Sequence, residues 1–322
     1  MKKKITLILA IALFFALIAW MIGDLFTGNP EPQKNPFDYG MKALRDADSI
    51  PDYTEAVSLK PTLPEITSLA TGPDGRIYIA GRGGVEILDG SGHILNRFTI
   101  PGNATCLTYM PDGNLAIGME DHLELWSPAG VLIAAWPAAD TASVITGVAA
   151  TPALIYLADA GKKIVYQYNR DGKLLARIGE KDPALKIPGF IVPSPYFDLA
   201  ISPAGDLWVA NTGHHKLEKY GPDGSLLSSW GETSMAVEGF TGCCNPSHFT
   251  FLRNGSFVTS EKGIERVKVY SPEGVFQSLV AGPESFDEGT RGLDLAAGLN
   301  GGILVLDPSR NMIRVFLPNK KN

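Results

Sequence analysis

The sequence predicts an all-β fold, a six-bladed β-propeller made of four-stranded antiparallel blades. Three observations support this fold class. Turn signals recur in step along most of the chain, short apolar runs of strand length separate them, and glycine and proline are abundant, with 35 and 23 copies in 322 residues. An excess of these two residues is typical of a β protein that is rich in turns.

The turn signals form two sets, one for each of two hairpins in a repeat unit. The first set is PDG at 73–75, PDG at 111–113, PAG at 203–205, RNG at 253–255 and LNG at 299–301. The second set is GSG at 90–92, PAG at 128–130, RDG at 170–172, PDG at 222–224 and PEG at 272–274. Asp-Gly and Asn-Gly pairs supply the positive φ angles that tight hairpins require. Each unit is therefore expected to contain four antiparallel strands.

The spacing of the first set counts the units. Its glycines are separated by 38, 92, 50 and 46 residues, and the interval of 92 spans a unit whose turn is reduced to Pro152 and Ala153. Runs such as RIYIA at 76–80 and DLWVA at 206–210 lie between the turns and are too short for helices. A period in the forties without helices predicts a propeller of six units.

The last unit, residues 292–318, contains only three predicted strands before the polar tail at 319–322. Such a unit would leave an exposed edge, so a fourth strand has to come from elsewhere. The segment YTEAVSL at 53–59 precedes the first unit and has the length of a strand. We expect this N-terminal strand to complete the last blade and close the ring, so that the propeller covers residues 53–318.

The repeat is most regular at 198–231, DLAISPAGDLWVANTGHHKLEKYGPDGSLLSSWG. This segment resembles the blades of the NHL-repeat six-bladed β-propellers, and the resemblance extends over residues 66–318. The resemblance implies the fold and, taken with the N-terminus described next, a membrane-anchored, extracytoplasmic member of that family. It implies little about activity, because one fold carries many functions.

The N-terminus predicts a membrane anchor. Residues 1–4 form a basic cytoplasmic flank, and residues 5–23 are 19 residues without a charge, about 28 Å long as a helix. We expect 5–23 to be a transmembrane signal-anchor helix, with a cleaved signal peptide as the alternative. The proline-rich segment 24–52 would then be a linker. Because basic residues next to a membrane helix stay in the cytoplasm, Lys2–Lys4 place the propeller on the periplasmic side of the inner (cytoplasmic) membrane.

The formal net charge of the chain is −6. An acidic balance argues against a nucleic-acid partner. The sequence also contains no phosphate-binding loop, no dinucleotide fingerprint and no HExxH motif. We therefore expect the chain to contact the membrane through its N-terminal helix and to bind a protein partner or a small ligand outside the cytoplasm.

Three long loops, 180–196, 232–246 and 283–291, are expected to gather on one face around the channel mouth. The second loop contains the least generic stretch of the chain, GFTGCCNPSHF at 239–249. Its adjacent Cys243 and Cys244 have three competing roles. They would form a strained vicinal disulfide, supply thiolates to a soft metal ion, or remain two reduced thiols packed in the loop.

Aligning the inner strands by the first turn places Cys106, Asp198, His248 and Asp294 at one level near the channel mouth. A thiol, an imidazole and two carboxylates at one level are candidates for binding a metal ion, such as Cu, Zn or Ca, or a polar ligand. The alternatives are structural. The aspartates would be hydrogen-bonding residues of the repeat, His248 a satisfied polar group and Cys106 a core residue.

Charged residues in SEKGIERVKVY mark a second candidate region. Glu261, Lys262 and Arg266 are candidates for a rim that binds an anionic ligand, and a solvated turn is the alternative.

The sequence favours a binding propeller over an enzyme. Six-bladed lactonases and amidating-type lyases resemble this fold and hold Ca²⁺ or Zn²⁺ in the channel, but the chain matches their ligand positions only in part. No catalytic triad is identified from the spacing. The alternative function is a metal- or thiol-dependent enzyme or redox protein centred on Cys243, Cys244 and His248.

Overall fold

The computed structural model describes residues 12–21, 52–181 and 189–319, and the chain divides into two compact units, residues 1–42 and 43–322. In the first unit, residues 12–21 form a helix. In the part of the chain that the structure describes, no helix combines the length and apolar character needed to cross a bilayer. The predicted transmembrane helix over 5–23 is therefore not confirmed, and its residues 5–11 and 22–23, like most of the predicted linker, lie outside the described residues.

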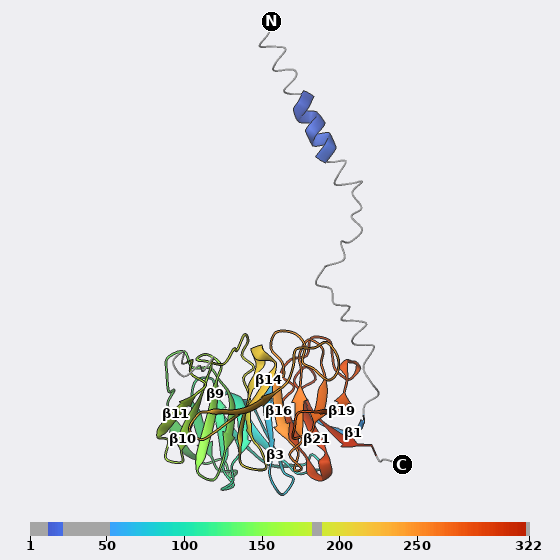
Figure 1. Ribbon diagram of the computed structural model, residues 1–322. Coiled ribbons are helices and arrows are strands. Elements are labelled where there is room, and N and C mark those ends of the chain that lie inside the picture. Colours follow the sequence, from blue (N-terminus) through green and yellow to red (C-terminus); the bar gives the residue numbers. More distant parts are fainter. Residues whose placement is uncertain (1–11, 22–51, 182–188, 320–322) are drawn as a thin grey trace. The chain divides into compact units, whose positions relative to one another are not determined.

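The second unit is a β-propeller of antiparallel sheets (Figure 1). Three sheets contain four consecutive strands each. The first comprises β8 (Ile145–Ala150), β9 (Leu154–Asp159), β10 (Ile164–Asn169) and β11 (Leu174–Ile178). The second comprises β12 (Leu199–Ile201), β13 (Leu207–Asn211), β14 (Lys216–Tyr220) and β15 (Leu226–Trp230). The third comprises β16 (His248–Phe251), β17 (Phe257–Ser260), β18 (Val267–Tyr270) and β19 (Phe276–Ala281).

The fourth four-stranded sheet joins the two ends of the propeller. Its order is β1 (Tyr53–Leu59), β22 (Met312–Pro318), β21 (Ile303–Asp307) and β20 (Leu295–Ala297). Strand β1 pairs with β22 in antiparallel register from Tyr53 opposite Pro318 to Leu59 opposite Ile313. The expected closure by the N-terminal segment 53–59 is thus confirmed.

The prediction of six separate blades requires a correction, because the described propeller contains five sheets. The fifth has six strands, β2 (Ile66–Thr71), β3 (Ile77–Leu88), β4 (Ile94–Tyr109), β5 (Leu115–Met119), β6 (Leu123–Trp126) and β7 (Leu132–Trp136). Both of the first two repeat units lie in it. The physical reason is the short link between them: β4 pairs with β3 up to Asn103 and with β5 from Ala104 onward, so the backbone ladder is not interrupted.

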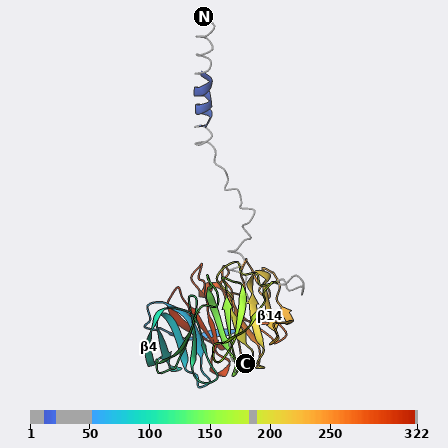
Figure 2. The same cartoon turned by 90° about the vertical axis from the view of Figure 1, so that its left-hand side faces the viewer.

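The inner segments of the sheets surround the channel. Strands β2, β8, β12, β16 and β20 each supply one segment, and the C-terminal half of β4 supplies another. Figure 2 shows β4 and β14 at opposite sides of the propeller. The predicted turns place their glycines in the left-handed region, with φ of +88° at Gly205 and +82° at Gly224. These turns therefore join consecutive antiparallel strands as hairpins, as the sequence predicted.

Arginine at the closing seam links strands from both ends of the chain. Arg314 on β22 bonds the Glu55 carboxylate on β1, and its Nη1 lies 3.5 Å from Oδ2 of Asp307, a fully buried carboxylate on β21. The Arg314 guanidinium also lies over the Phe316 ring, 5.3 Å from its centroid. These contacts add side-chain interactions to the β1–β22 backbone ladder.

Truncating Leu59 tests the closing strand. Leu59 is buried in a cluster with Leu69, Ile79 and Leu306, so Leu59→Ala removes apolar contacts between β1 and the rest of the propeller. We expect a loss of about 2–5 kcal/mol in the free energy of unfolding, measured by chemical denaturation. Val57→Ala, on the same strand but 43% exposed, is the control. Equal and small losses for both variants would contradict a stabilising role for this strand.

Candidate functional site

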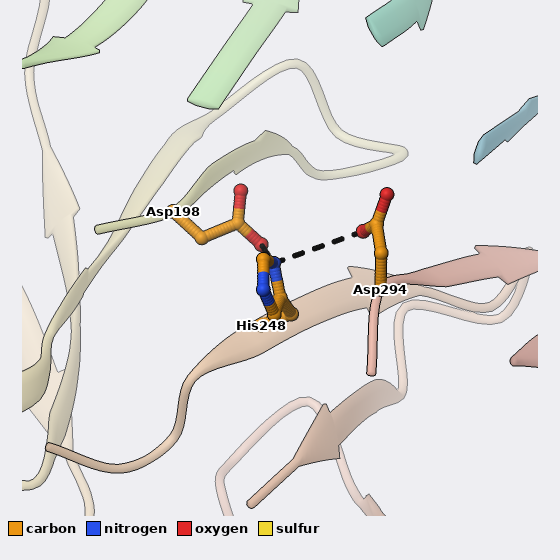
Figure 3. Close-up of side chains that lie close together, drawn as sticks. All are labelled: Asp198, His248 and Asp294. Carbon is orange, nitrogen blue, oxygen red and sulfur yellow. Dashed lines mark ion pairs between the residues drawn. The ribbon is translucent and has the colours of Figure 1, made fainter. Parts of the chain in front are cut away.

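Three side chains from three different sheets lie close together in the channel. Asp198 precedes β12, His248 begins β16 and Asp294 precedes β20, and all three line a channel cavity of about 310 Å³. Figure 3 shows the His248 ring between the two carboxylates. The register read from the turns predicted that these residues share one level, and the structure brings them together.

The His248 ring is too far from either carboxylate for a direct hydrogen bond. Nδ1 of His248 lies 3.6 Å from Oδ2 of Asp198 and 3.8 Å from Oδ1 of Asp294, whereas N–H···O bonds span about 2.7–3.2 Å. One potential ligand atom from each residue lies within 4.8 Å of the others. The three side chains are only 13–15% exposed. The three groups therefore form one cluster of potential ligand atoms that is mostly shielded from solvent.

Both aspartates are held in place by backbone amides. Oδ1 of Asp198 accepts from the amide of Leu199 at 2.8 Å, and Oδ2 accepts from the amide of Phe249 at 3.0 Å. Phe249 lies on the next inner strand, β16. Asp198 therefore bridges two neighbouring sheets, which is the structural role expected as the alternative, and the bridge also fixes the direction of its carboxylate.

Asp294 makes the same kind of bridge between the sheet that contains β20 and the sheet that contains β2. Oδ1 of Asp294 accepts from the amide of Leu295 at 2.8 Å, and Oδ2 accepts from the amide of Leu69 at 2.9 Å and from the Ser68 hydroxyl at 2.7 Å. Oγ of Ser68 in turn accepts from the amide of Leu107 at 3.1 Å. Polar residues at this register position thus link three pairs of adjacent inner segments.

Cys106 occupies the same register position but packs in the core. Its thiol lies against Gly118, where a Cβ would come within 2.3 Å of the sulfur. Burial raises the pKa of the Cys106 thiol and keeps it protonated. Among the described residues, the cluster suited to three-ligand metal binding does not include Cys106. The predicted four-residue set is therefore reduced to Asp198, His248 and Asp294.

The carboxylates of Asp198 and Asp294 and the imidazole of His248 shift one another's pKa values. Burial alone disfavours the charged form of His248, but the neighbouring Asp198 and Asp294 outweigh burial and raise the pKa of His248. Burial and the Asp198 charge raise the pKa of Asp294, although the nearby His248 partly opposes that change. A positive charge between the carboxylates is therefore favoured at this position.

The two adjacent cysteines lie outside this three-residue cluster. They are unbonded, with Cys243 exposed and Cys244 buried, and their Sγ atoms are 3.0 Å apart. Cys244 lies near Tyr196, whose ring meets the His248 ring edge-on at 5.9 Å. Within the described part of the chain, neither cysteine joins His248 in a group that could hold a metal ion. The set Cys243, Cys244 and His248 is thus not one ligand cluster.

The predicted charged rim is largely buried. Glu261 and Arg266 are each 1% exposed and form an ion pair with Oε2 and Nε 2.9 Å apart, so they are not rim residues. Lys268, which the sequence analysis missed, lies 2.9 Å from the same oxygen. Lys262 alone of the three candidates remains at the mouth, with its Nζ 4.9 Å from the centroid of the Tyr196 ring.

The long loop 232–246 explains this burial. Nζ of Lys268 donates to the carbonyls of Val237 and Gly239 at 3.0 and 2.6 Å, and Oε1 of Glu261 accepts from the Thr241 amide at 3.0 Å. Buried backbone groups of a loop need such partners. The sequence contains one signal for this ion cluster, which is the proximity of an acidic residue at 261 to basic residues at 266 and 268. The sequence does not show that the loop covers these residues.

Neutralising Glu261 tests the importance of this buried ion cluster. Glu261→Gln keeps the shape of the side chain but removes the Glu261 negative charge from Arg266 and Lys268. We expect a loss of about 3–5 kcal/mol in the free energy of unfolding, measured by denaturant titration. Glu288→Gln, at an exposed position, serves as the control. If both variants unfold at the same denaturant concentration as the parent, the cluster does not stabilise the fold.

Comparisons with known proteins agree on the fold. A streptogramin B lyase structure matches with a TM-score of 0.59 and 13% identity over 83% of this chain and 98% of that chain. A catalytically inactive histidine-to-alanine variant of virginiamycin B lyase from Staphylococcus aureus with quinupristin matches with a TM-score of 0.56 and 14% identity, covering 84% and 87% of the two chains. The WD40 propeller domain of Doa1 matches with a TM-score of 0.54 and 14% identity over 79% of each chain.

No family model matches the chain, and no curated protein matches it. The resemblance to NHL-repeat propellers is therefore not confirmed at the level of family. Because the similar structures share at most 14% of their residues with this chain, they show the fold alone. The chain is similar in architecture to propellers that include both a lyase and a WD40 domain.

Proposed function

We propose that the protein is a binding propeller that holds a divalent cation between Asp198, His248 and Asp294 and binds a small ligand or a partner protein at the channel mouth. One observation carries the proposal: three potential ligand atoms from three sheets converge within 4.8 Å. Their separations from His248 Nδ1, 3.6 and 3.8 Å, are close to the roughly 3.4 Å expected between two ligands about 2.1 Å from a tetrahedral ion.

The donor set favours zinc among the ions considered from the sequence. One imidazole nitrogen and two carboxylate oxygens are ordinary zinc ligands. Calcium takes six to eight oxygen ligands, and Cu(I) selects thiolate or thioether sulfur. Three protein ligands leave the fourth zinc position open to water or to a ligand. The backbone amides that fix both carboxylates would act as the outer support that metal ligands commonly have.

A second cavity supports ligand binding next to the ion. It has a volume of about 450 Å³ and shares His248 with the channel. Tyr196, Arg291 and Glu120 also line it, so apolar, cationic and anionic groups are all available. A cavity of this size with a few polar groups is typical of small-molecule sites. A small polar ligand that reaches the open position of the ion is the occupant that this arrangement favours.

Titration of zinc into the purified full-length chain, freed of metal, tests the site. We expect one zinc ion per chain by calorimetry. His248→Ala and Asp294→Asn should each weaken binding by more than about tenfold, because each removes a ligand. His93→Ala, at a histidine whose side chain is 82% exposed, is the control. Absence of zinc binding by the parent, or unchanged binding by His248→Ala, would refute the metal site.

The same titration has an expected pH dependence. The pKa of His248 is raised by the two aspartates, and a zinc ligand must be neutral, so binding has to displace a proton below that pKa. Zinc affinity should therefore fall as the pH is lowered through the His248 pKa, with the loss approaching about tenfold per pH unit. Affinity that is flat from neutral to mildly acidic pH would show that His248 is not a ligand.

The location of the propeller is also part of the proposal. The uncharged run 5–23 after three lysines supports a single-pass anchor in the inner membrane with the propeller outside the cytoplasm. We expect the full chain to stay in the membrane fraction after a high-salt wash, and a variant that lacks residues 1–23 to be released. Recovery of the full chain in the soluble fraction would contradict the anchor.

A further inference from the structure

The loop between β15 and β16 carries two thiols that are in contact with each other. The Sγ atoms of Cys243 and Cys244 lie 3.0 Å apart. The proposed metal site does not use them, because its ligands are Asp198, His248 and Asp294. A pair of adjacent cysteines can exchange two electrons with an external thiol or disulfide, and a vicinal disulfide, once formed, is strained and easily reduced.

The loop that carries the thiols is held firmly. Nδ2 of Asn245 donates to the carbonyls of Thr241 and Lys262 at 2.6 and 3.0 Å, and its Oδ1 accepts from the Lys262 amide at 3.0 Å. Glu261 accepts from the Thr241 amide on the other side of the cysteines. The backbone is therefore fixed immediately before and after the pair, so the two sulfurs stay together.

The two thiols differ in access and in charge environment. Cys243 is exposed, whereas Cys244 is 1% exposed. Burial alone disfavours a Cys244 thiolate, but the Cys243 thiol, the Ser194 hydroxyl and the Lys262 ammonium outweigh burial and lower the pKa of Cys244. The contact with Cys244 raises the pKa of Cys243. One sulfur is thus open to attack, and the other is stabilised as an anion.

We propose that Cys243 and Cys244 form a redox-active pair that undergoes thiol–disulfide exchange with an external dithiol, with Cys243 as the exchanging sulfur and Cys244 as the leaving group. In the oxidised protein, a thiolate of the external dithiol attacks Sγ of Cys243. A mixed disulfide forms, the Cys243–Cys244 bond breaks, and its electron pair remains on Cys244 beside Lys262.

The second thiol of the external dithiol then completes the exchange. It attacks the external sulfur of the mixed disulfide and releases Cys243, while the dithiol becomes a disulfide. Two electrons and two protons have passed from the external dithiol to the protein, which ends as two thiols. An external disulfide reverses both steps and restores the oxidised pair. Because thiols of lower pKa leave faster, the position of Lys262 assigns the leaving role to Cys244.

Cys106 provides an internal reference. It is buried in the core against Gly118, and burial raises the pKa of its thiol. It should therefore stay unreactive in the folded protein under conditions in which the pair is oxidised or modified.

The test uses the purified full-length chain in mixtures of reduced and oxidised dithiothreitol, with free thiols counted by maleimide mass shift. We expect the parent to lose two of its three free thiols together, without forming dimers. With glutathione disulfide, Cys244→Ser should form a mixed disulfide at Cys243, whereas Cys243→Ser should form none at the buried Cys244. Peptide mapping of the parent protein treated with iodoacetamide compares the alkylation rates of the cysteines without any variant. We expect Cys243 to be alkylated faster than Cys106.

Lys262→Gln tests the leaving-group role. Reduction of its oxidised pair by dithiothreitol should be slower than in the parent by at least about threefold. Lys173→Gln, at an exposed lysine, should reduce at the parental rate. Failure of the parent to form the intramolecular disulfide, or reaction of Cys244→Ser and Cys243→Ser at equal rates, would overturn the proposal. Zinc binding by both cysteine variants should match the parent, which separates this site from the metal site.

Discussion

The backbone pairing of β1 with β22 is the interaction on which the rest of the propeller depends. A ring of sheets has a channel only when its first and last members are joined, and the joining strand here comes from residues 53–59. Closure brings the amide of Leu69 to the Asp294 carboxylate, two groups that are far apart in the sequence. Closure therefore supplies a backbone amide that holds Asp294, one of the three candidate ligands.

The aspartates of the channel combine a structural and a chemical role. Each links two neighbouring inner segments through backbone amides, and each directs an oxygen toward His248. The hydrogen bonds that join neighbouring inner segments thus also orient the two carboxylates that line the channel. Replacing one of them removes both an inter-sheet bridge and a potential ligand, so stability and binding are linked at these two positions.

Local features of the fold were predictable, and features that depend on distant segments were not. The turn glycines fixed the strand order and the level of Asp198, His248 and Asp294, because hairpin geometry is local. The merging of the first two units was not visible, since it depends on backbone bonds around Asn103. The burial of Glu261 and Arg266 depends on a loop that folds over them from earlier in the chain.

The buried cluster of Glu261, Arg266 and Lys268 couples the loop 232–246 to the segment 261–268. We expect these two segments to change together in evolution. The loop 232–246 supplies carbonyls and an amide. The link between β17 and β18, together with β18, supplies the charged groups that bond to them. Each stretch thus supplies hydrogen-bond or charge partners to the other. Transfer of the cysteine loop to another propeller would therefore require the charged partners to move with it, and sequence change in either stretch should be matched by change in the other.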